Sequence, residues 1–373
     1  MELVFEKEEL WEAMQIVGNV APSRTTFPIL ANVLIRAEND QIRLAATDSE
    51  VGIKFVVSGE IVEPGSITIP AKKLSDIVRE LPSVTDSKEP AKVKLTTLAN
   101  DRIEIECENA KFRIVGLTDE EFPNLPDLGD DFFTLKSRTL CNMFQKTAFA
   151  VSTEETRHFL NGIYFNVADN SIRMVATDGK RLAVAIQNET GTGDQEIGVI
   201  IPTKAVNNVV RTFTGGEDVN VALLENQIVF ASQDITLISR LIEGEYPDYE
   251  AVMAPAMSNE VELTVDTQRL LAVIRRVSLL ANPKTPSIKI ESGEAELKIS
   301  ASTPELGEAQ EQMQAKIEGG AVEIAFNARY VMDVLRNIEE SQVLFKFRDS
   351  LSPVLVTPLD EDSYKCVIMP MRL

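Results

Sequence analysis

Two aspartates occur in the same sequence context 130 residues apart, and a recurring acidic pair is one way to build a metal site or an acid–base pair. Asp48 ends the segment 42–48 (IRLAATD), and Asp178 ends the similar segment 172–178 (IRMVATD). Each follows strand-forming residues and precedes a turn, where Asp usually accepts hydrogen bonds from backbone amides. We therefore expect these two residues to cap turns.

The other residues able to do chemistry do not form a catalytic set. The chain has one histidine, His158, which leaves no convincing Ser-His-Asp arrangement, so we expect it to be a polar surface residue. Gly191 and Gly193 are too isolated to form a phosphate-binding loop. The three cysteines lie too far apart for a zinc knuckle or a redox pair. We expect no catalytic residue, no metal and no cofactor.

Composition and length indicate a globular protein of two or three domains. The chain has 373 residues, of which 44% are hydrophobic, and this exceeds one ordinary core. No apolar run is long enough to span a membrane, and the first residues are acidic where a signal peptide would be apolar. Three scattered cysteines suit a reducing compartment. These features predict a cytoplasmic protein.

The two aspartate segments belong to a longer repeat. Apolar residues at i, i+3, i+4 and i+7 predict an amphipathic helix early in each third of the chain and a second helix later in each third. The early helices carry Leu10, Ala13, Met14 and Val17, then Leu140, Met143, Phe144 and Thr147, then Leu270, Val273, Ile274 and Val277. The later helices carry Leu74, Ile77, Val78 and Leu81, then Val206, Val209, Val210 and Phe213, then Val331, Val334, Leu335 and Ile338.

Short segments of alternating apolar and polar residues lie between these helices and predict antiparallel strands. They include 163–167 and 288–299, and Ser292-Gly293-Glu294 is typical of a hairpin turn. A degenerate third version of the aspartate segment occurs at 297–303. The predicted fold class is α+β, with three tandem copies of a domain that packs two helices on antiparallel sheets.

Two segments rich in proline and acidic residues separate the copies, at 122–131 and 246–249. They are typical of linkers. The period is too long for a solenoid, so each copy should be a whole domain. We expect domains at 1–126, 127–253 and 254–373.

Charge is distributed unevenly along the chain. A net charge of −21 argues against nucleic-acid binding, since phosphates require Lys and Arg. The predicted helical windows, however, hold fourteen Lys or Arg against seven Asp or Glu, so they carry +7 and the remainder −28. The windows are 7–19, 71–81, 136–150, 203–213, 266–280 and 327–338.

Cations occupy equivalent positions in the three later helices. One lies two positions before the leading apolar residue and one lies five positions after it, which places both about 140–160° around the helix from that residue. These positions hold Lys72 and Arg79, Lys204 and Arg211, and Arg329 and Arg336. A single basic helix face is usually a solvated surface, but three equivalent ones favour a surface that meets a polyanion.

Several blocks in the same order resemble the bacterial sliding clamp family, the β subunit of DNA polymerase III. They are 24–30 (RTTFPIL), 160–162 (LNG), 176–184 (ATDGKRLAV), 246–249 (YPDY) and 369–373 (MPMRL), and the resemblance covers essentially the whole chain. It implies three clamp domains and a head-to-tail homodimer that closes a six-domain ring, with helices lining the bore and sheets outside. It also implies a processivity subunit with no catalytic site of its own.

The resemblance implies that the ring encircles duplex DNA and meets its phosphates without reading sequence. The implied DNA-binding residues are Arg24, Lys72, Lys73, Arg79, Lys204 and Arg211. The implied partners are the catalytic subunit of DNA polymerase III, the clamp loader, and other polymerases and repair proteins that carry clamp-binding peptides. The implied location is the nucleoid within the cytoplasm, with no membrane partner.

The resemblance also implies a pocket that binds these short peptides. Two methionines on either side of a proline provide an adaptable apolar wall for many partners, although Met369 and Met371 are also compatible with a simple core cap. Many family members carry a basic residue just before Val252, whereas this chain has Glu250-Ala251, and Lys180 compensates only in part. The implied lining is Leu160, Thr177, Gly179, Arg181, Leu182, Pro247, Val252, Val367, Met369, Pro370, Met371 and Arg372.

The implied subunit contact joins the first domain of one chain to the third domain of another. Phe112 and Ile114 would lie on a strand edge and face Leu279 and Leu280 near a helix end, so that the sheet continues across the boundary. Ordinary core positions are the alternative for these four residues. The alternative function is a peptide-binding scaffold that does not encircle DNA, in which an acidic segment would cover the basic helix faces of a monomer.

Overall fold

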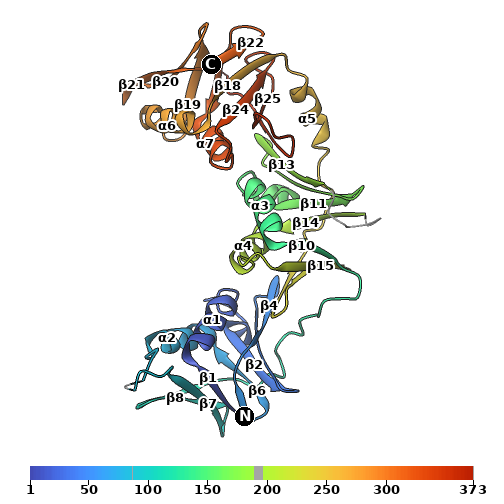
Figure 1. Cartoon of the computed structure of the whole chain (residues 1–373), viewed down its shortest axis with the longest axis vertical. Coiled ribbons are helices and arrows are strands. Elements are labelled where there is room, and N and C mark those ends of the chain that lie inside the picture. Colours follow the sequence, from blue (N-terminus) through green and yellow to red (C-terminus); the bar gives the residue numbers. More distant parts are fainter. Residues whose placement is uncertain (86, 189–195, 373) are drawn as a thin grey trace. The chain divides into compact units, whose positions relative to one another are not determined.

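The structure is a computed structural model that describes residues 1–85, 87–188 and 196–372 (Figure 1). Gly191, Gly193 and Leu373 lie outside the described residues. The chain forms two compact units, which are described separately below. Unit 1 comprises Met1–Arg138 and Asn207–Leu241, and unit 2 comprises Thr139–Val206 and Ile242–Leu373.

Unit 1 contains two antiparallel sheets. The five-stranded sheet has the order β5 (Glu60–Glu63), β1 (Glu2–Glu6), β7 (Lys92–Leu98), β8 (Arg102–Cys107) and β9 (Ala110–Val115). The eight-stranded sheet has the order β10 (Phe133–Lys136), β15 (Asp218–Leu224), β16 (Gln227–Ala231), β17 (Ile235–Arg240), β4 (Val51–Val57), β3 (Gln41–Thr47), β2 (Asn32–Glu38) and β6 (Gly65–Pro70).

Unit 2 also contains two antiparallel sheets. The nine-stranded sheet has the order β14 (Ile197–Pro202), β11 (Gly162–Ala168), β12 (Ser171–Thr177), β13 (Arg181–Asn188), β26 (Tyr364–Ile368), β25 (Val354–Pro358), β24 (Gln342–Phe347), β18 (Val261–Asp266) and β22 (Lys316–Glu318). The four-stranded sheet has the order β21 (Gly307–Gln314), β20 (Glu296–Thr303), β19 (Ser287–Ser292) and β23 (Glu323–Asn327).

All six predicted helices are present, and their apolar residues face the core. The early helices are α1 (Lys7–Val17), α3 (Ser137–Ala148) and α6 (Thr267–Val277), and the later ones are α2 (Ala71–Glu80), α4 (Thr203–Thr212) and α7 (Ala328–Arg336). α1 packs against α2, and α6 packs against α7. Thr147, the one polar residue among the predicted core positions of the early helices, is fully buried, and its hydroxyl donates to the Met143 carbonyl at 2.9 Å.

The large sheets run on from one copy of the repeat to the next. In unit 1, β17 of the second copy pairs with β4 of the first copy, and in unit 2, β26 of the third copy pairs with β13 of the second. The predicted degenerate segment 297–303 lies in β20, which pairs with β19 and β21 as β12 pairs with β11 and β13. Pairing between copies removes edges that would otherwise be exposed.

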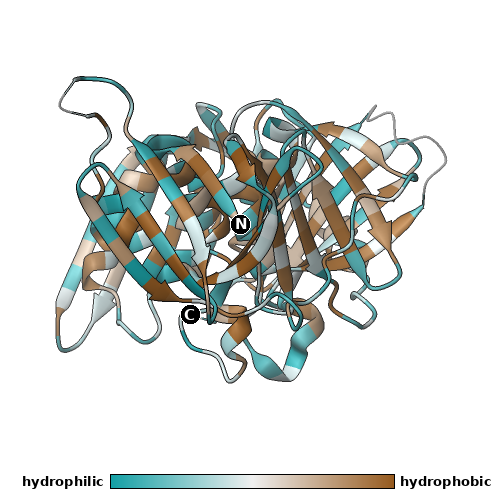
Figure 2. Ribbon diagram, turned by 90° about the horizontal axis from the view of Figure 1, so that it is seen from below, coloured by the Kyte–Doolittle hydropathy of each residue, from teal (hydrophilic) through white to brown (hydrophobic). Residues whose placement is uncertain are grey.

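The strands show the alternation that the sequence predicts. Ile163, Phe165 and Val167 are fully buried on β11, and their neighbours are partly exposed. Figure 2 shows hydrophobic and hydrophilic residues alternating along several strands. No helix among the described residues is both long and apolar enough to cross a membrane.

The described residues also form three short 3-10 helices: η1 (Pro28–Ala31), η2 (Glu155–Leu160) and η3 (Ser278–Leu280). The linker 122–131 has no helix or strand, as predicted. The second linker leads instead into a helix that the sequence analysis missed, α5 (Glu250–Met257). Its sequence, EAVMAPAM, is apolar on all sides and contains Pro255, so it lacks the periodicity that identifies an amphipathic helix.

Candidate functional site

The first repeated turn lies between β3 and β4 and is held by Asp48. The Oδ1 atom of Asp48 accepts from the amides of Glu50 at 2.9 Å and Val51 at 2.8 Å. The Thr47 hydroxyl donates to the Val51 carbonyl at 2.9 Å and accepts from the Ser49 amide at 3.1 Å. The turn places Ser49 at a φ of 80°. The predicted capping role of Asp48 is confirmed.

The second repeated turn, between β12 and β13, has the same hydrogen bonds. The Oδ1 atom of Asp178 accepts from the amides of Lys180 at 2.8 Å and Arg181 at 3.0 Å. The Thr177 hydroxyl donates to the Arg181 carbonyl at 2.6 Å and accepts from the Gly179 amide at 3.0 Å. Gly179 has a φ of 83°. Asp178 is therefore also a turn cap.

The second turn borders a cavity of about 440 Å³ in unit 2. η2, the strands β12, β13 and β26, and the start of α5 all contribute to it. The lining residues are Arg157, Phe159, Leu160, Thr177, Gly179, Lys180, Arg181, Leu182, Pro247, Asp248, Tyr249, Val252, Val367 and Met369. Most of its surface is apolar, with charged side chains at its rim, which is the usual composition of a site that binds small molecules or peptides.

A packed apolar cluster adjoins the cavity, since Leu182 and Val367 belong to both. Val184, Met253 and Val367 are buried together there, and Tyr164 stacks on Tyr246 with ring centroids 5.0 Å apart. Burial raises the pKa of the Tyr246 hydroxyl. The α5 helix packs against β24, β25 and β26 of the nine-stranded sheet and presents Val252 to the cavity.

Arg181 links the cavity to α7. Its Nη1 atom donates to Asp333 Oδ2 at 2.7 Å, its Nε atom donates to Asp178 Oδ2 at 3.2 Å, and Nη2 donates to the Phe149 carbonyl. Its guanidinium carbon lies 4.6 Å from the ring centroid of Tyr330. Only 11% of the Arg181 side chain is exposed, so this charge is held by partners on three elements.

The basic positions on the later helices are all exposed, as the periodicity predicts. Lys72, Lys73 and Arg79 project from α2, Lys204 and Arg211 from α4, and Arg329 and Arg336 from α7. Arg24 is exposed in the loop after α1. Arg79 forms ion pairs with Asp76 and Glu80, and Arg336 pairs with Asp333 at 2.9 Å.

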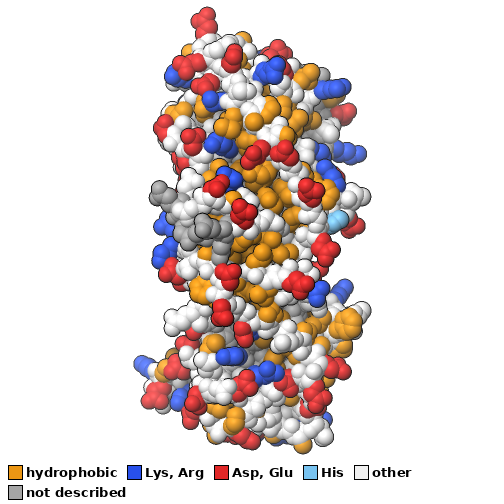
Figure 3. All heavy atoms as spheres, turned by 90° about the vertical axis from the view of Figure 1, so that its right-hand side faces the viewer, with side chains coloured by type: hydrophobic (Ala, Val, Ile, Leu, Met, Phe, Trp, Pro, Cys, Tyr) orange, Lys and Arg blue, Asp and Glu red, His pale blue; other side chains and the backbone are white. Residues whose placement is uncertain are grey.

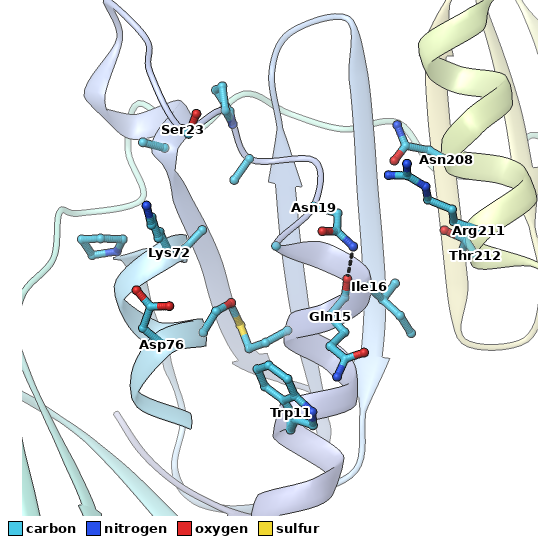
Figure 4. A pocket seen from close by; sticks show the side chains of 18 residues that line it. Trp11, Gln15, Ile16, Asn19, Ser23, Lys72, Asp76, Asn208, Arg211 and Thr212 are labelled. Carbon is cyan, nitrogen blue, oxygen red and sulfur yellow. Dashed lines mark hydrogen bonds between the residues drawn. The ribbon is translucent and has the colours of Figure 1, made fainter. Parts of the chain in front are cut away.

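Two of these cations line one hollow in unit 1. The hollow measures about 800 Å³ and lies among α1, α2 and the end of α4 (Figure 4). Lys72 and Arg211 border it from different helices, together with Asn19 and Asn208. Neither cation forms an ion pair with any residue that the structure describes. Polar amides beside unpaired cations suit an anionic ligand.

Two sheet edges carry the residues predicted at a subunit contact. β9 ends the five-stranded sheet of unit 1, and its Phe112 is 38% exposed while Ile114 is partly exposed. β21 ends the four-stranded sheet of unit 2, beside η3, where Leu279 is 76% exposed and Leu280 is partly exposed. None of these four side chains is in the core.

Sequence profiles of one family match almost the entire chain. They describe the N-terminal, central and C-terminal domains of the DNA polymerase III beta subunit and match residues 1–126, 134–248 and 255–372. The chain belongs to the DNA polymerase III beta subunit family. It therefore functions as a sliding clamp in DNA replication and has three clamp domains.

Individual relatives agree with this assignment over the full length. The beta sliding clamp of Chlamydia muridarum is 32% identical over 374 residues, which span 100% of this chain and 99% of the relative. The crystal structure of the DNA polymerase III subunit beta from Pseudomonas aeruginosa has a TM-score of 0.94 at 32% identity, with 100% of both chains covered. A Pseudomonas aeruginosa sliding clamp bound to griselimycin gives the same TM-score, identity and coverage.

The structure brings most of the predicted pocket residues together. Nine of the twelve line the cavity, and Pro370, Met371 and Arg372 do not. Met371 instead donates its amide to the Ala325 carbonyl at 2.8 Å, which ties the chain end to β23. His158 is exposed on η2, next to Phe159 of the lining.

The sequence analysis missed Arg157, Phe159, Asp248 and Tyr249 of the lining. Asp248 carried a usable signal, because an Asp two residues before a helix often caps it. Arg157 and Phe159 had none. Among the described residues, no group of three or more His, Cys, Asp or Glu side chains could hold a metal ion.

Proposed function

We propose that two copies of this chain pair head to tail into a ring that encircles duplex DNA, and that partner proteins bind the ring at the cavity beside Gly179. The cavity is named the peptide pocket from here on. The partners are the catalytic subunit of DNA polymerase III, the clamp loader, and other polymerases and repair proteins with exposed peptides.

The pattern of strand pairings between copies carries the proposal of a ring. The last strand of the second copy, β17, pairs with β4, and the last strand of the third copy, β26, pairs with β13. β9 and β21 are the strands in the equivalent positions of the first and third copies, and both are sheet edges. Pairing β9 of one chain with β21 of another completes the set and leaves no free edge of this kind.

The side chains at these edges support the same contact. Phe112, Val115, Leu279 and Leu306 are 38%, 62%, 76% and 50% exposed. Removing apolar surface from water is favourable by roughly 25 cal/mol per Å². A dimer would therefore cover side chains that a monomer exposes at both edges.

The basic helix positions supply the hold on DNA. Phosphate contacts from long, exposed Lys and Arg side chains carry no sequence information, which a sliding protein requires. The candidates are Arg24, Lys72, Lys73, Arg79, Lys204 and Arg211. Figure 3 shows acidic, basic and hydrophobic side chains together on one side of the structure. The net charge of the chain is −21, so DNA is repelled by the chain as a whole and attracted only where cations are concentrated.

The non-encircling scaffold is the less favoured function. It requires an acidic segment over the basic helix positions, and in the described ranges 1–85, 87–188 and 196–372 these positions are exposed. The acidic partners of Arg79 and Arg336 come from their own helices.

Retention on DNA tests the ring. The protein is loaded onto a nicked circular duplex with a clamp loader and ATP, free protein is removed, and the circle is cut once. We expect the protein to leave the linear product by sliding off its ends. Retention on the linear DNA would contradict encirclement.

A charge at the proposed subunit contact gives a second test. Leu279→Glu is expected to shift the sedimentation coefficient from dimer to monomer and to abolish retention on the circle. Leu351→Glu is the matched control, because Leu351 is also exposed, at 63%, but lies between β24 and β25, which belong to neither of the sheets that end in β9 and β21. A dimeric Leu279→Glu protein would argue against this interface.

A further inference from the structure

The charged residues around the peptide pocket are unevenly distributed, since the Lys and Arg of its lining come from 157–181 whereas Asp248 of the lining is followed by Glu250. We infer, on the basis of the proposed peptide pocket, that the two ends of this pocket carry opposite charge. The pocket selects peptides that place an acidic group beside Arg157 and Lys180 and a neutral or basic residue beside Asp248 and Glu250. The apolar part of the peptide occupies the cavity between these groups.

The basic side of the rim comes from η2 and the second repeated turn. Arg157 is held in place because its Nη2 atom donates to Glu154 Oε2 at 2.7 Å and to the Asp178 carbonyl at 3.3 Å. Lys180 is exposed and forms no ion pair within the described part of the chain. Glu154 balances one of the two cations, so this side keeps one positive charge for a ligand.

Gly179 keeps the basic side compact. A Cβ atom at this position would lie 2.9 Å from Arg157 Nη1. The guanidinium therefore packs directly on the turn that also presents Lys180. A carboxylate beside this turn would be within reach of both cations, and charge-assisted hydrogen bonds to a guanidinium are stronger than neutral ones.

The acidic side of the rim comes from the start of α5. Asp248 lines the cavity and is exposed, and Glu250 follows it as an exposed residue. Ala251 supplies no cation there. This segment therefore carries two negative charges, with no Lys or Arg between 246 and 257, and the cation that acts on it from another element is Arg173 of β12, beside Tyr249.

The helix N-terminus does not offset these charges. A helix start normally attracts anions through its free amides. Here Asp248 Oδ1 already accepts from the amides of Glu250 at 3.1 Å and Ala251 at 3.3 Å. An acidic peptide group at this end would meet two carboxylates and amides that are already occupied.

Peptides of equal composition provide the test. The probe is a fluorescein-labelled peptide with four apolar residues, including Leu and Phe, between two flanks of two serines. In one charged version the N-terminal flank is Glu-Glu and the C-terminal flank is Lys-Lys. In the other version the two flanks are exchanged. Because both versions have the same charges, the field of a chain with a net charge of −21 acts on them almost equally, and the difference reports the rim.

The dissociation constants are measured by fluorescence anisotropy on the intact dimer at low and at physiological salt. We expect one charged version to bind about two- to fivefold more tightly than the other, as exposed ion pairs allow. Lys180→Glu combined with Glu250→Lys leaves the net charge unchanged and is expected to reduce or reverse this ratio. Lys92→Glu combined with Glu225→Lys is the control, since both residues are exposed in unit 1.

Each outcome has a definite meaning. A ratio that falls toward one at high salt and reverses in the rim variant supports the polarised pocket. The polarised pocket is contradicted if the two charged peptides bind the natural protein equally, or if the rim variant leaves their ratio unchanged. Binding of the serine-flanked peptide in that case still supports the peptide pocket. Failure of all three peptides to bind overturns the peptide pocket and the polarity together.

Discussion

The two repeated turns of this chain have the same backbone conformation but different surroundings. In both turns an aspartate accepts from the amides two and three residues later, and in both the next residue has a φ near 80°. Each turn also accepts one backbone hydrogen bond from the next copy of the repeat: the amide of Arg240 donates to the Glu50 carbonyl, and the amide of Met369 donates to the Lys180 carbonyl. The turn geometry alone therefore does not make a pocket.

The side chains at three positions account for the difference. Ser49, Glu50 and Val51 of the first turn are replaced by Gly179, Lys180 and Arg181 in the second. Val51 is a buried core residue, whereas Arg181 reaches Asp333 at 2.7 Å on another element. The second turn thus exchanges an apolar anchor for a charged one and exposes its backbone at the pocket.

The largest expected effect comes from giving the second turn the anchor of the first. Arg181→Val removes a nearly buried cation and leaves Asp178 and Asp333 without this partner, which is expected to cost about 2–4 kcal/mol of unfolding free energy. Urea unfolding followed by circular dichroism measures it, because the single tryptophan, Trp11, lies in unit 1.

A double variant distinguishes charge from volume in that result. Arg181→Val with Asp333→Asn also removes the carboxylate that Arg181 contacts, which in the single variant keeps only Arg336 as an ion-pair partner among the described residues. We expect the double variant to recover part of the loss. If the double variant is as unstable as the single variant, lost packing rather than an orphaned charge is the cause.

The same substitution in both turns gives the next largest effect. Asp48→Ala and Asp178→Ala each remove two hydrogen bonds to backbone amides, at an expected cost of about 1–2 kcal/mol. Asp178→Ala should cost more, because Asp178 also pairs with Arg181 at 3.2 Å. Urea unfolding of both variants by tryptophan fluorescence and circular dichroism makes the comparison. Equal losses would show that the ion pair contributes nothing.

Adding a methyl group to the second turn should have a smaller effect. Gly179→Ala adds left-handed strain of about 1 kcal/mol and brings a Cβ to 2.9 Å from Arg157 Nη1. The flexible guanidinium can move, so we expect a modest loss of stability and weaker binding of the serine-flanked peptide. Ser49→Ala is the matched control in the first turn, where both measurements should stay at natural values.

The smallest effect is expected when the first turn receives the glycine of the second. Ser49→Gly relieves strain at a φ of 80° but adds freedom to the unfolded chain, so the net gain should be about 0–1 kcal/mol. Tryptophan fluorescence in urea reports it. A clear loss of stability would show that the Ser49 side chain does more than tolerate the turn.

The sequence by itself determined six of the helices, their core faces and the capped turns. These features depend on residues a few positions apart, and such spacing is visible as a period of 3.6 or as an aspartate before two amides. The exposure of all the equivalent cations followed from the same periodicity. For the pocket, nine residues came from motif resemblance rather than from periodicity.

Only the tertiary structure decided which strands join the copies, where Arg181 finds its partners, and that α5 contributes to the pocket lining. Pairing of β17 with β4 uses backbone hydrogen bonds, which every residue except proline can donate and accept, so no side-chain pattern predicts it. Arg181 and Asp333 are 152 residues apart, and neither shows in its local sequence that the other is near. The sequence of α5 is apolar on all sides and contains a proline, so it shows no amphipathic period. Its helix is stabilised by tertiary packing instead.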